Sequence, residues 1–413
     1  MKRYFSAALL FIFLFQAAAS AQNNPALLDS LLKANSSLFP EVAQNPSKYQ
    51  VQILYTQVDR NRKNRPHFTT YKYNVNKNNY FYPASSVKIA GAVLSLQKLN
   101  ELNIKGLDKY TRLRIDSAYS GQTRVLLDLS SKDSLPSIAH YVKKIFLASD
   151  NDAFNRTYEF LGQKYLNEEL WKRGLKDVKL QHRVSVALSN EENRHTNPFT
   201  FYDGDKIFYH QEAQVNPVEY RNDLPTLSRG NGYIDGNGKL VNEPKDFTYN
   251  NYISVESLQG ILKRIIFPES FPKEERFNLT GDDYKFLYKY MSMLARESDY
   301  PKYDPKEYPD ANVKFLMYGG IKDTIPSNIR IFNKIGLAYG YLTDNAYIVD
   351  FDKKVEFFVT AVIYVNNDEI FNDDKYEYDQ TGLPFLKNLG KVIYNYELSR
   401  PRKHKPDLSI FKN

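Results

Sequence analysis

The spacing of apolar residues changes along the chain and divides it into three parts. Near both ends apolar and polar residues alternate, in the segments 49–58, 67–75, 328–335, 345–351 and 355–365. This period of two predicts strands, and the last three segments are expected to form an antiparallel meander. The middle, about 101–310, has the helical period instead, with helices expected at 137–147, 155–162, 254–266 and 284–295. The sequence therefore predicts an α+β fold: an antiparallel sheet flanked by helices in three layers (α/β/α), with a helical subdomain.

The first 21 residues have the organisation of a secretory signal peptide. Lys2 and Arg3 precede an apolar run over 7–15, and small residues follow around Ala19-Ser20-Ala21, an A-x-A cleavage site. We expect a mature chain that begins near Gln22 and functions in the periplasm or outside the cell. No later segment approaches the roughly 18 to 20 continuous apolar residues of a membrane helix, so no membrane span is expected.

The rest of the chain is expected to be one catalytic domain, 22–399, followed by a solvated basic tail, 400–413. Its α/β part comprises about 22–100 and 311–399, and its helical part, with insertions, about 101–310; the stretch 197–252 is rich in Gly, Asn and Pro and predicts loops and small hairpins. The chain has no cysteine, which excludes disulfides and thiolate chemistry. Its net charge of +8 falls to +6 without Lys2 and Arg3, and the scattered basic residues favour carboxylate-bearing or anionic envelope substrates over nucleic acid.

Lys88 is an unusual residue in its segment, because from Val87 to Leu96 only Lys88 and Ser95 are polar. Ser85 stands three residues earlier and shares a helix face with it, whereas Ser86 points elsewhere. Pro83 fits only a first helical turn, where free backbone N–H groups could stabilise an oxyanion on attack by the Ser85 hydroxyl. Burial would lower the pKa of Lys88 until it could take a proton from serine. A structural lysine that extends its amine to water is the alternative.

Two further motifs have simple structural explanations when each is taken alone. Ser149-Asp150-Asn151 joins two predicted helices, where such residues commonly form an N-cap. Lys334 and Gly336 lie near the end of a predicted strand, where an edge lysine and a turn glycine are common.

In this order the three motifs resemble Ser-x-x-Lys, Ser-Asp-Asn and Lys-Thr-Gly of the serine β-lactamase and penicillin-binding-protein superfamily, and Ser149 follows Ser85 by 64 residues, similar to class A β-lactamases. The resemblance implies that Ser85 is the nucleophile, Lys88 its base and Ser149 a proton relay to the leaving nitrogen. It also implies that Asn151 holds the substrate amide, that Lys334 attracts its carboxylate, and that the backbone N–H of Leu337, after Gly336, donates to the oxyanion opposite that of Ser85. Asn155 falls where the family often has asparagine.

Two positions depart from the family. Ile335 replaces the hydroxyl residue after the strand lysine, and the pattern Glu-x-x-Leu-Asn, whose glutamate activates the deacylating water, is missing. Glu191 and Glu192, beside His195, are the nearest candidates for that base; a polar surface loop is the alternative.

The predicted function is that of an exported serine hydrolase, class A β-lactamase-like, that opens a β-lactam amide through an acyl-enzyme. A D,D-peptidase or amidase acting on cell-wall peptides, and a catalytically silent envelope protein that binds glycans or peptides through 197–252, remain alternatives. No cofactor or metal is expected, since the six histidines are dispersed. The expected partner is a small-molecule or peptidoglycan-derived acyl substrate, with no nucleic acid; the sequence leaves the oligomeric state open.

Overall fold

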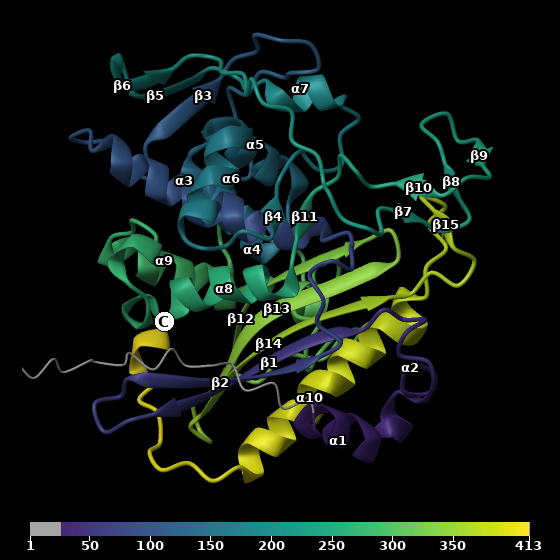
Figure 1. Ribbon diagram of the computed structural model, residues 1–413. Helices are drawn as coiled ribbons and strands as arrows, with labels where there is room; N and C mark the ends of the chain where they lie inside the picture. The colour runs from purple at the N-terminus through teal and green to yellow at the C-terminus, as the bar shows by residue number, and fades with distance from the viewer. Residues whose placement is uncertain (1–25, 413) are drawn as a thin grey trace, which may run out of the picture.

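A five-stranded antiparallel sheet forms the centre of the computed structural model, which describes residues 26–412 (Figure 1). The strands lie in the order β12-β13-β14-β1-β2, with bounds Ile329–Ala338, Tyr341–Asp350, Val355–Tyr364, Gln52–Arg60 and Pro66–Tyr73. β1 pairs with β14, so strands from the two ends of the chain are neighbours. β12 is an edge strand, which leaves one of its sides free to face the helix that carries Ser85.

Both faces of the sheet are covered, and this explains why β13 and β14 are buried along their whole length. In β1, Ile53 and Tyr55 pack on one face and Leu54 and Val58 on the other. The first face is covered by α1 (Ala26–Ala34) and α10 (Leu383–Ser399), with α2 (Pro40–Gln44) nearby, and the second by α8 (Val255–Ile266) (Figure 1). The predicted α+β class and its three layers are therefore confirmed.

A helical region lies beyond α8, on the side of the sheet opposite α10 (Figure 1). It contains the helices α3 (Lys88–Leu102), α4 (Ile138–Leu147), α5 (Asn151–Leu161), α6 (Gln163–Lys172), α7 (Asn190–Arg194) and α9 (Gly281–Ser292). α3 contacts α4, α5 and α6, so the helix that carries Lys88 is enclosed by other helices. This packing allows the first part of α3, from Ile89 to Leu96, to be apolar on all sides apart from Ser95.

The middle of the chain also forms several small sheets. Their strands are β3 (Arg112–Ile115) with β5 (Phe199–Asp203) and β6 (Lys206–Gln211); β4 (Val178–Lys179) with β11 (Tyr252–Ile253); β7 (Ser228–Arg229) with β10 (Lys245–Asp246); and β8 (Gly232–Ile234) with β9 (Leu240–Val241) and β15 (Ile370–Phe371). Most of these short strands lie in the stretch 197–252, where loops and hairpins were expected.

The C-terminal segment differs from the solvated tail that the sequence suggests. Leu408 and Phe411 are fully buried, and Arg400 and Arg402 both pair with Glu397 of α10. The segment ends in the short helix η8 (Ser409–Phe411), whose Phe411 packs against aromatic rings of the core. The basic residues of this segment favour a solvated end, but the buried carboxylate of Glu397 and the apolar side chains of Leu408 and Phe411 hold it to the domain.

The predicted signal peptide, 1–21, lies outside the described residues. Within 26–412, no helix combines the length and the apolar character that a membrane crossing requires.

Candidate active site

Ser85 lies at the start of the α3 helix, in a single 3-10 turn, η2 (Ala84–Val87), that leads directly into α3. It is partly exposed, while Ser86 is fully buried and its hydroxyl donates to the Pro83 carbonyl at 2.7 Å. Ala84, just before Ser85, has φ = +47°, a left-handed conformation that costs free energy in a residue with a side chain. The backbone thus turns the Ser85 hydroxyl outward and keeps that of Ser86 internal.

The Lys88 amine is buried and makes two hydrogen bonds across to the α4–α5 turn. Its side chain is 0% exposed, and Nζ donates to the Ser149 carbonyl and, at 2.5 Å, to Oδ1 of Asn151. Burial lowers the pKa of Lys88 to about 7, although the negative charge of Asp150 acts in the opposite direction. A lysine with this pKa is partly neutral near neutral pH and can accept a proton.

Ser149 occupies the turn between α4 and α5 with a left-handed backbone, φ = +56°. Asp150 caps α5, since its side chain accepts a hydrogen bond from the Ala153 N–H at 2.7 Å. The N-cap expected for this tripeptide is therefore present and belongs to Asp150. The residues on either side of Asp150 contact the lysines instead: Asn151 bonds Lys88, and Ser149 bonds Lys88 and Lys334.

Lys334 reaches the same serine from the sheet. It lies on β12, is 2% exposed, and its Nζ donates to Ser149 Oγ at 2.7 Å and to the Ile335 carbonyl at 3.0 Å. Burial holds the pKa of Lys334 well below its usual value, and the charge of Lys88 lowers it further. The approach of an anion would favour the protonated form of this lysine.

β12 and η2 lie against each other, and Gly336 makes this possible. A Cβ at Gly336 would lie 2.3 Å from the Pro83 carbonyl oxygen and 3.0 Å from the Ser86 nitrogen. Leu337 pairs with Leu342 of β13, two residues before the turn Tyr339-Gly340. By the alternation of an antiparallel ladder, the Leu337 N–H points away from β13, toward the edge that η2 occupies. Ser85 and Leu337 thus come from two elements in contact, and their backbone N–H groups are the candidates for an oxyanion site.

A cavity of about 220 Å³ lies over these residues. Its lining includes Ser85, Ser149, Asn151, Ile335 and Leu337, together with Tyr82, Ala84, Val184, Ser185 and Ala338. The structure therefore brings the three sequence motifs to one cavity, with the amines of Lys88 and Lys334 bonded to residues of its wall.

Ser185 lines this cavity and was missed from the sequence. Asn151 Nδ2 donates to Ser185 Oγ at 2.9 Å, and Asn155 holds the preceding residue, Val184, through both its backbone N–H (2.8 Å) and its carbonyl (3.0 Å). Because Asn151 already donates to Ser185 Oγ, the Ser185 hydroxyl hydrogen is available to donate into the cavity. One sequence signal could have found it: Ser185 precedes Leu188 by three residues, the spacing of glutamate and leucine in the family pattern.

Glu191 and Glu192 are directed to other partners. Glu192 forms a capping box with Ser189 at the start of α7, and Glu191 pairs with Arg194 at 2.8 Å and His195 at 3.0 Å. Neither lines the cavity, and among its lining residues in the described chain there is no Asp or Glu. The structure thus gives these glutamates local structural contacts and does not bring them to Ser85.

Comparison with known proteins agrees with the motifs. Residues 39–230, which include Ser85, Lys88, Ser149 and Asn151, match the model of the β-lactamase enzyme family. With its fold and its Ser-Lys site, the chain has the features of a serine hydrolase. The match supports its place in the serine β-lactamase and penicillin-binding-protein superfamily.

Solved structures of β-lactamases are similar over most of the chain, at low identity. The β-lactamase of Sphaerobacter thermophilus is 10% identical, with 90% of this chain and 98% of that chain covered, at a TM-score of 0.49. A class A β-lactamase from Clostridium kluyveri is 14% identical, with 88% of this chain and 98% of that chain covered, at a TM-score of 0.48. The chromosome-encoded β-lactamase of Vibrio parahaemolyticus is 13% identical, with 88% of this chain and 100% of that chain covered, at a TM-score of 0.48. The strand order and the helix layers define the fold class. No curated protein matches the sequence.

Proposed function

We propose that the protein is an exported serine hydrolase that opens β-lactam amides through an acyl-enzyme at Ser85. One observation carries this proposal: Lys88 and Lys334 both hydrogen-bond to Ser149, which lines the same cavity as Ser85. Such an arrangement supplies a nucleophile, a base of suitable pKa and a proton donor for the leaving nitrogen.

The reaction would proceed in two halves. Ser85 Oγ attacks the amide carbonyl and its proton passes to Lys88, while the N–H groups of Ser85 and Leu337 stabilise the oxyanion. The carbon–nitrogen bond then breaks as Ser149 gives its hydroxyl proton to the nitrogen, and the lysine pair restores that proton. In the second half water attacks the ester, which releases a carboxylic acid and returns the proton to Ser85.

A second candidate is a D,D-peptidase or amidase that acts on cell-wall peptides. The absence of a carboxylate among the described residues that line the cavity favours it, because no side chain of that kind can activate the deacylating water. Such an enzyme would also be acylated by penicillin but would release it slowly. The predicted signal peptide, with its expected periplasmic or secreted product, suits either candidate.

Mass spectrometry of the mature protein after incubation with benzylpenicillin tests the proposal. We expect an adduct of the mass of the intact antibiotic, mapped to the peptide that contains Ser85 and absent from Ser85→Ala. Ser86→Ala is the matched control and should still be labelled, because the Ser86 hydroxyl is bonded to Pro83. Turnover of a chromogenic cephalosporin then separates a lactamase from a peptidase. A protein that is never labelled would be a binder without this chemistry.

A further inference from the structure

A second, larger cavity lies at the opposite end of the sheet from Ser85. It has a volume of about 710 Å³ and is enclosed by the β1–β2 hairpin, the end of α8, the short helix η3 (Pro268–Ser270), α9 and η8. Gln52 of β1 is in register with Gly336 of β12 across the sheet. Arg60, which lines the second cavity, is eight residues further along β1, so about 27 Å separates it from Gln52 at the usual rise of a strand. The cavity is therefore a separate site, within the size range of ligand pockets.

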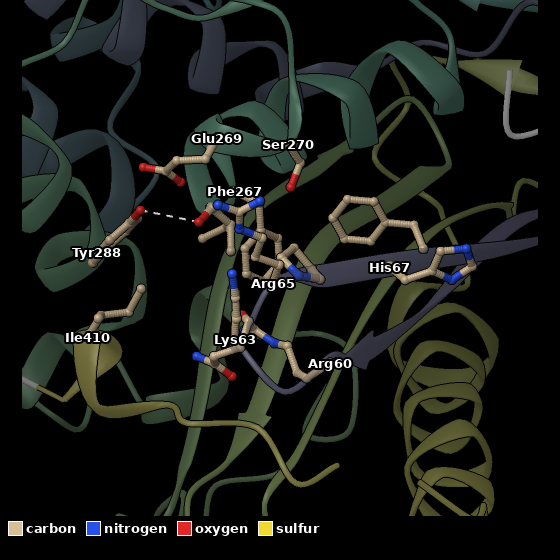
Figure 2. A pocket seen from close by; sticks show the side chains of 13 residues that line it. Arg60, Lys63, Arg65, His67, Phe267, Glu269, Ser270, Tyr288 and Ile410 are labelled. Atoms are coloured by element: carbon tan, nitrogen blue, oxygen red, sulfur yellow. Dashed lines mark hydrogen bonds between the residues drawn. The ribbon is translucent and has the colours of Figure 1, made fainter. Parts of the chain in front are cut away.

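Two basic side chains reach into this cavity without an ionic partner. Figure 2 shows Lys63 and Arg65 extending from the hairpin turn toward Phe267. Both are exposed, and within residues 26–412 no ion pair involves either of them. Arg60 is different, because it forms a bidentate pair with the buried Glu356 at 2.6 and 2.7 Å. Glu269 is the one carboxylate among the described lining residues, so unpaired positive charge exceeds negative charge.

The turn that carries the two cations is held in place from both sides. The Arg60 guanidinium donates to the Asn64 carbonyl at 2.6 Å. The Asn64 side chain donates to the Asp407 carbonyl at 2.9 Å and accepts from the Asp407 N–H at 3.0 Å. The C-terminal segment thus fixes the turn between Lys63 and Arg65, which reduces the ordering cost of binding a ligand there.

Apolar side chains form a second part of the wall, beside the polar lining residues Asn64, His67, Ser270 and Tyr288. Phe68, Ile266 and Phe267 line it, and Ile410 of η8 lies at its edge with 61% of its surface exposed. Exposed apolar surface beside unpaired cations suits a ligand that has an anionic group next to an apolar one. We propose that this cavity binds a carboxylate attached to an apolar side chain, as at the C-terminus of a peptide that ends in an apolar residue. The proposal is independent of the chemistry at Ser85.

Fluorescence titration of the mature protein with N-dansyl-L-phenylalanine tests this. We expect saturable binding that weakens at least tenfold in Lys63→Gln/Arg65→Gln and tightens severalfold in Glu269→Gln, since the latter removes a repelling carboxylate. The double variant Lys302→Gln/Lys306→Gln makes the same charge change at exposed residues elsewhere and should bind as the wild type does. The methyl ester of the probe should bind at least tenfold more weakly to the wild type.

Three results would overturn the proposal. The first is no saturable binding to the wild type. The second is binding that survives Lys63→Gln/Arg65→Gln but is lost in Lys334→Met, which would place the probe in the Ser85 cavity. The third is equal binding of acid and ester. If the double variant fails to fold, Glu269→Gln decides alone: unchanged or weaker binding contradicts the proposal.

Discussion

Lys334 Nζ lies 2.7 Å from Ser149 Oγ, so the edge strand β12 and the α4–α5 turn, 185 residues apart in sequence, are joined by a hydrogen bond between two side chains. Lys88 holds the same serine through its carbonyl. Lys334 thus fixes the side chain of Ser149 and Lys88 fixes its backbone. The proposed chemistry therefore depends on the protonation of both amines.

The pH dependence of acylation should follow Lys88. Its pKa of about 7 predicts that the rate of acylation by penicillin rises as the pH passes through about 7, because the neutral amine is the base. Asp150→Asn removes the charge that raises this pKa, while asparagine can still cap α5. The rising limb should therefore move to lower pH in the variant. Stopped-flow acylation rates from pH 5 to 9 measure the pH at which the rate rises in both forms. The same pH in wild type and Asp150→Asn would mean that another group controls the rate.

Lys88→Met should abolish acylation and leave a folded protein. In the wild type the folded pKa of about 7 lies below the unfolded value, so the unfolded chain binds one more proton between about pH 7 and 10. The free energy of unfolding should therefore rise with pH across this window, and Lys88 should contribute up to about 1.4 kcal/mol per pH unit to the rise. In Lys88→Met this contribution to the pH dependence should be absent. Urea unfolding at pH 6, 8 and 9.5 measures the difference. An unfolded variant would indicate a structural lysine.

Ile335→Thr should speed acylation by substrates that have a carboxylate. Ile335 lines the cavity beside Lys334, and a hydroxyl there adds a hydrogen bond to a charged group, worth about 1.5 to 3 kcal/mol. An ester of the same penicillin should react equally with both forms. Ile331→Thr, on the same strand and face but outside the cavity lining, is the matched control for the loss of a buried apolar group. Equal gains on acid and ester would mean that the hydroxyl contacts another part of the substrate.

Ser185→Glu should shorten the life of the acyl-enzyme. Ser185 lines the cavity and accepts a hydrogen bond from Asn151, so a carboxylate there could orient and deprotonate water near the ester. Ser185→Gln has the same size without the base and should not do so. Glu191→Gln and Glu192→Gln should leave deacylation unchanged, because these side chains contact α7 and its neighbours. Decay of the adduct, followed by mass spectrometry, distinguishes these outcomes; faster decay in both Ser185 variants would argue against base catalysis.

The sequence alone determined the fold class and the position of the candidate nucleophile. Alternation in β12, β13 and β14 and the helical period of α8 and α9 are local patterns, set by which side of each element is buried. Ser85 and Lys88 share a helix face whatever surrounds them, and Ser149-Asp150-Asn151 and Lys334 could be placed because they recur as motifs in a known order. These properties depend on near neighbours in the chain.

Only the tertiary structure decided which distant groups meet. Loops that cross between elements bring Lys334 into contact with Ser149. They also place Ser185 at the cavity, where Asn155 holds the neighbouring Val184, and they keep Glu191 and Glu192 away from it. The burial of Phe411 likewise depends on rings from distant segments, Phe267 and Phe332, against which it packs. Such contacts leave no periodic trace in the sequence, because loop closure and burial of single side chains are set by the whole packed domain.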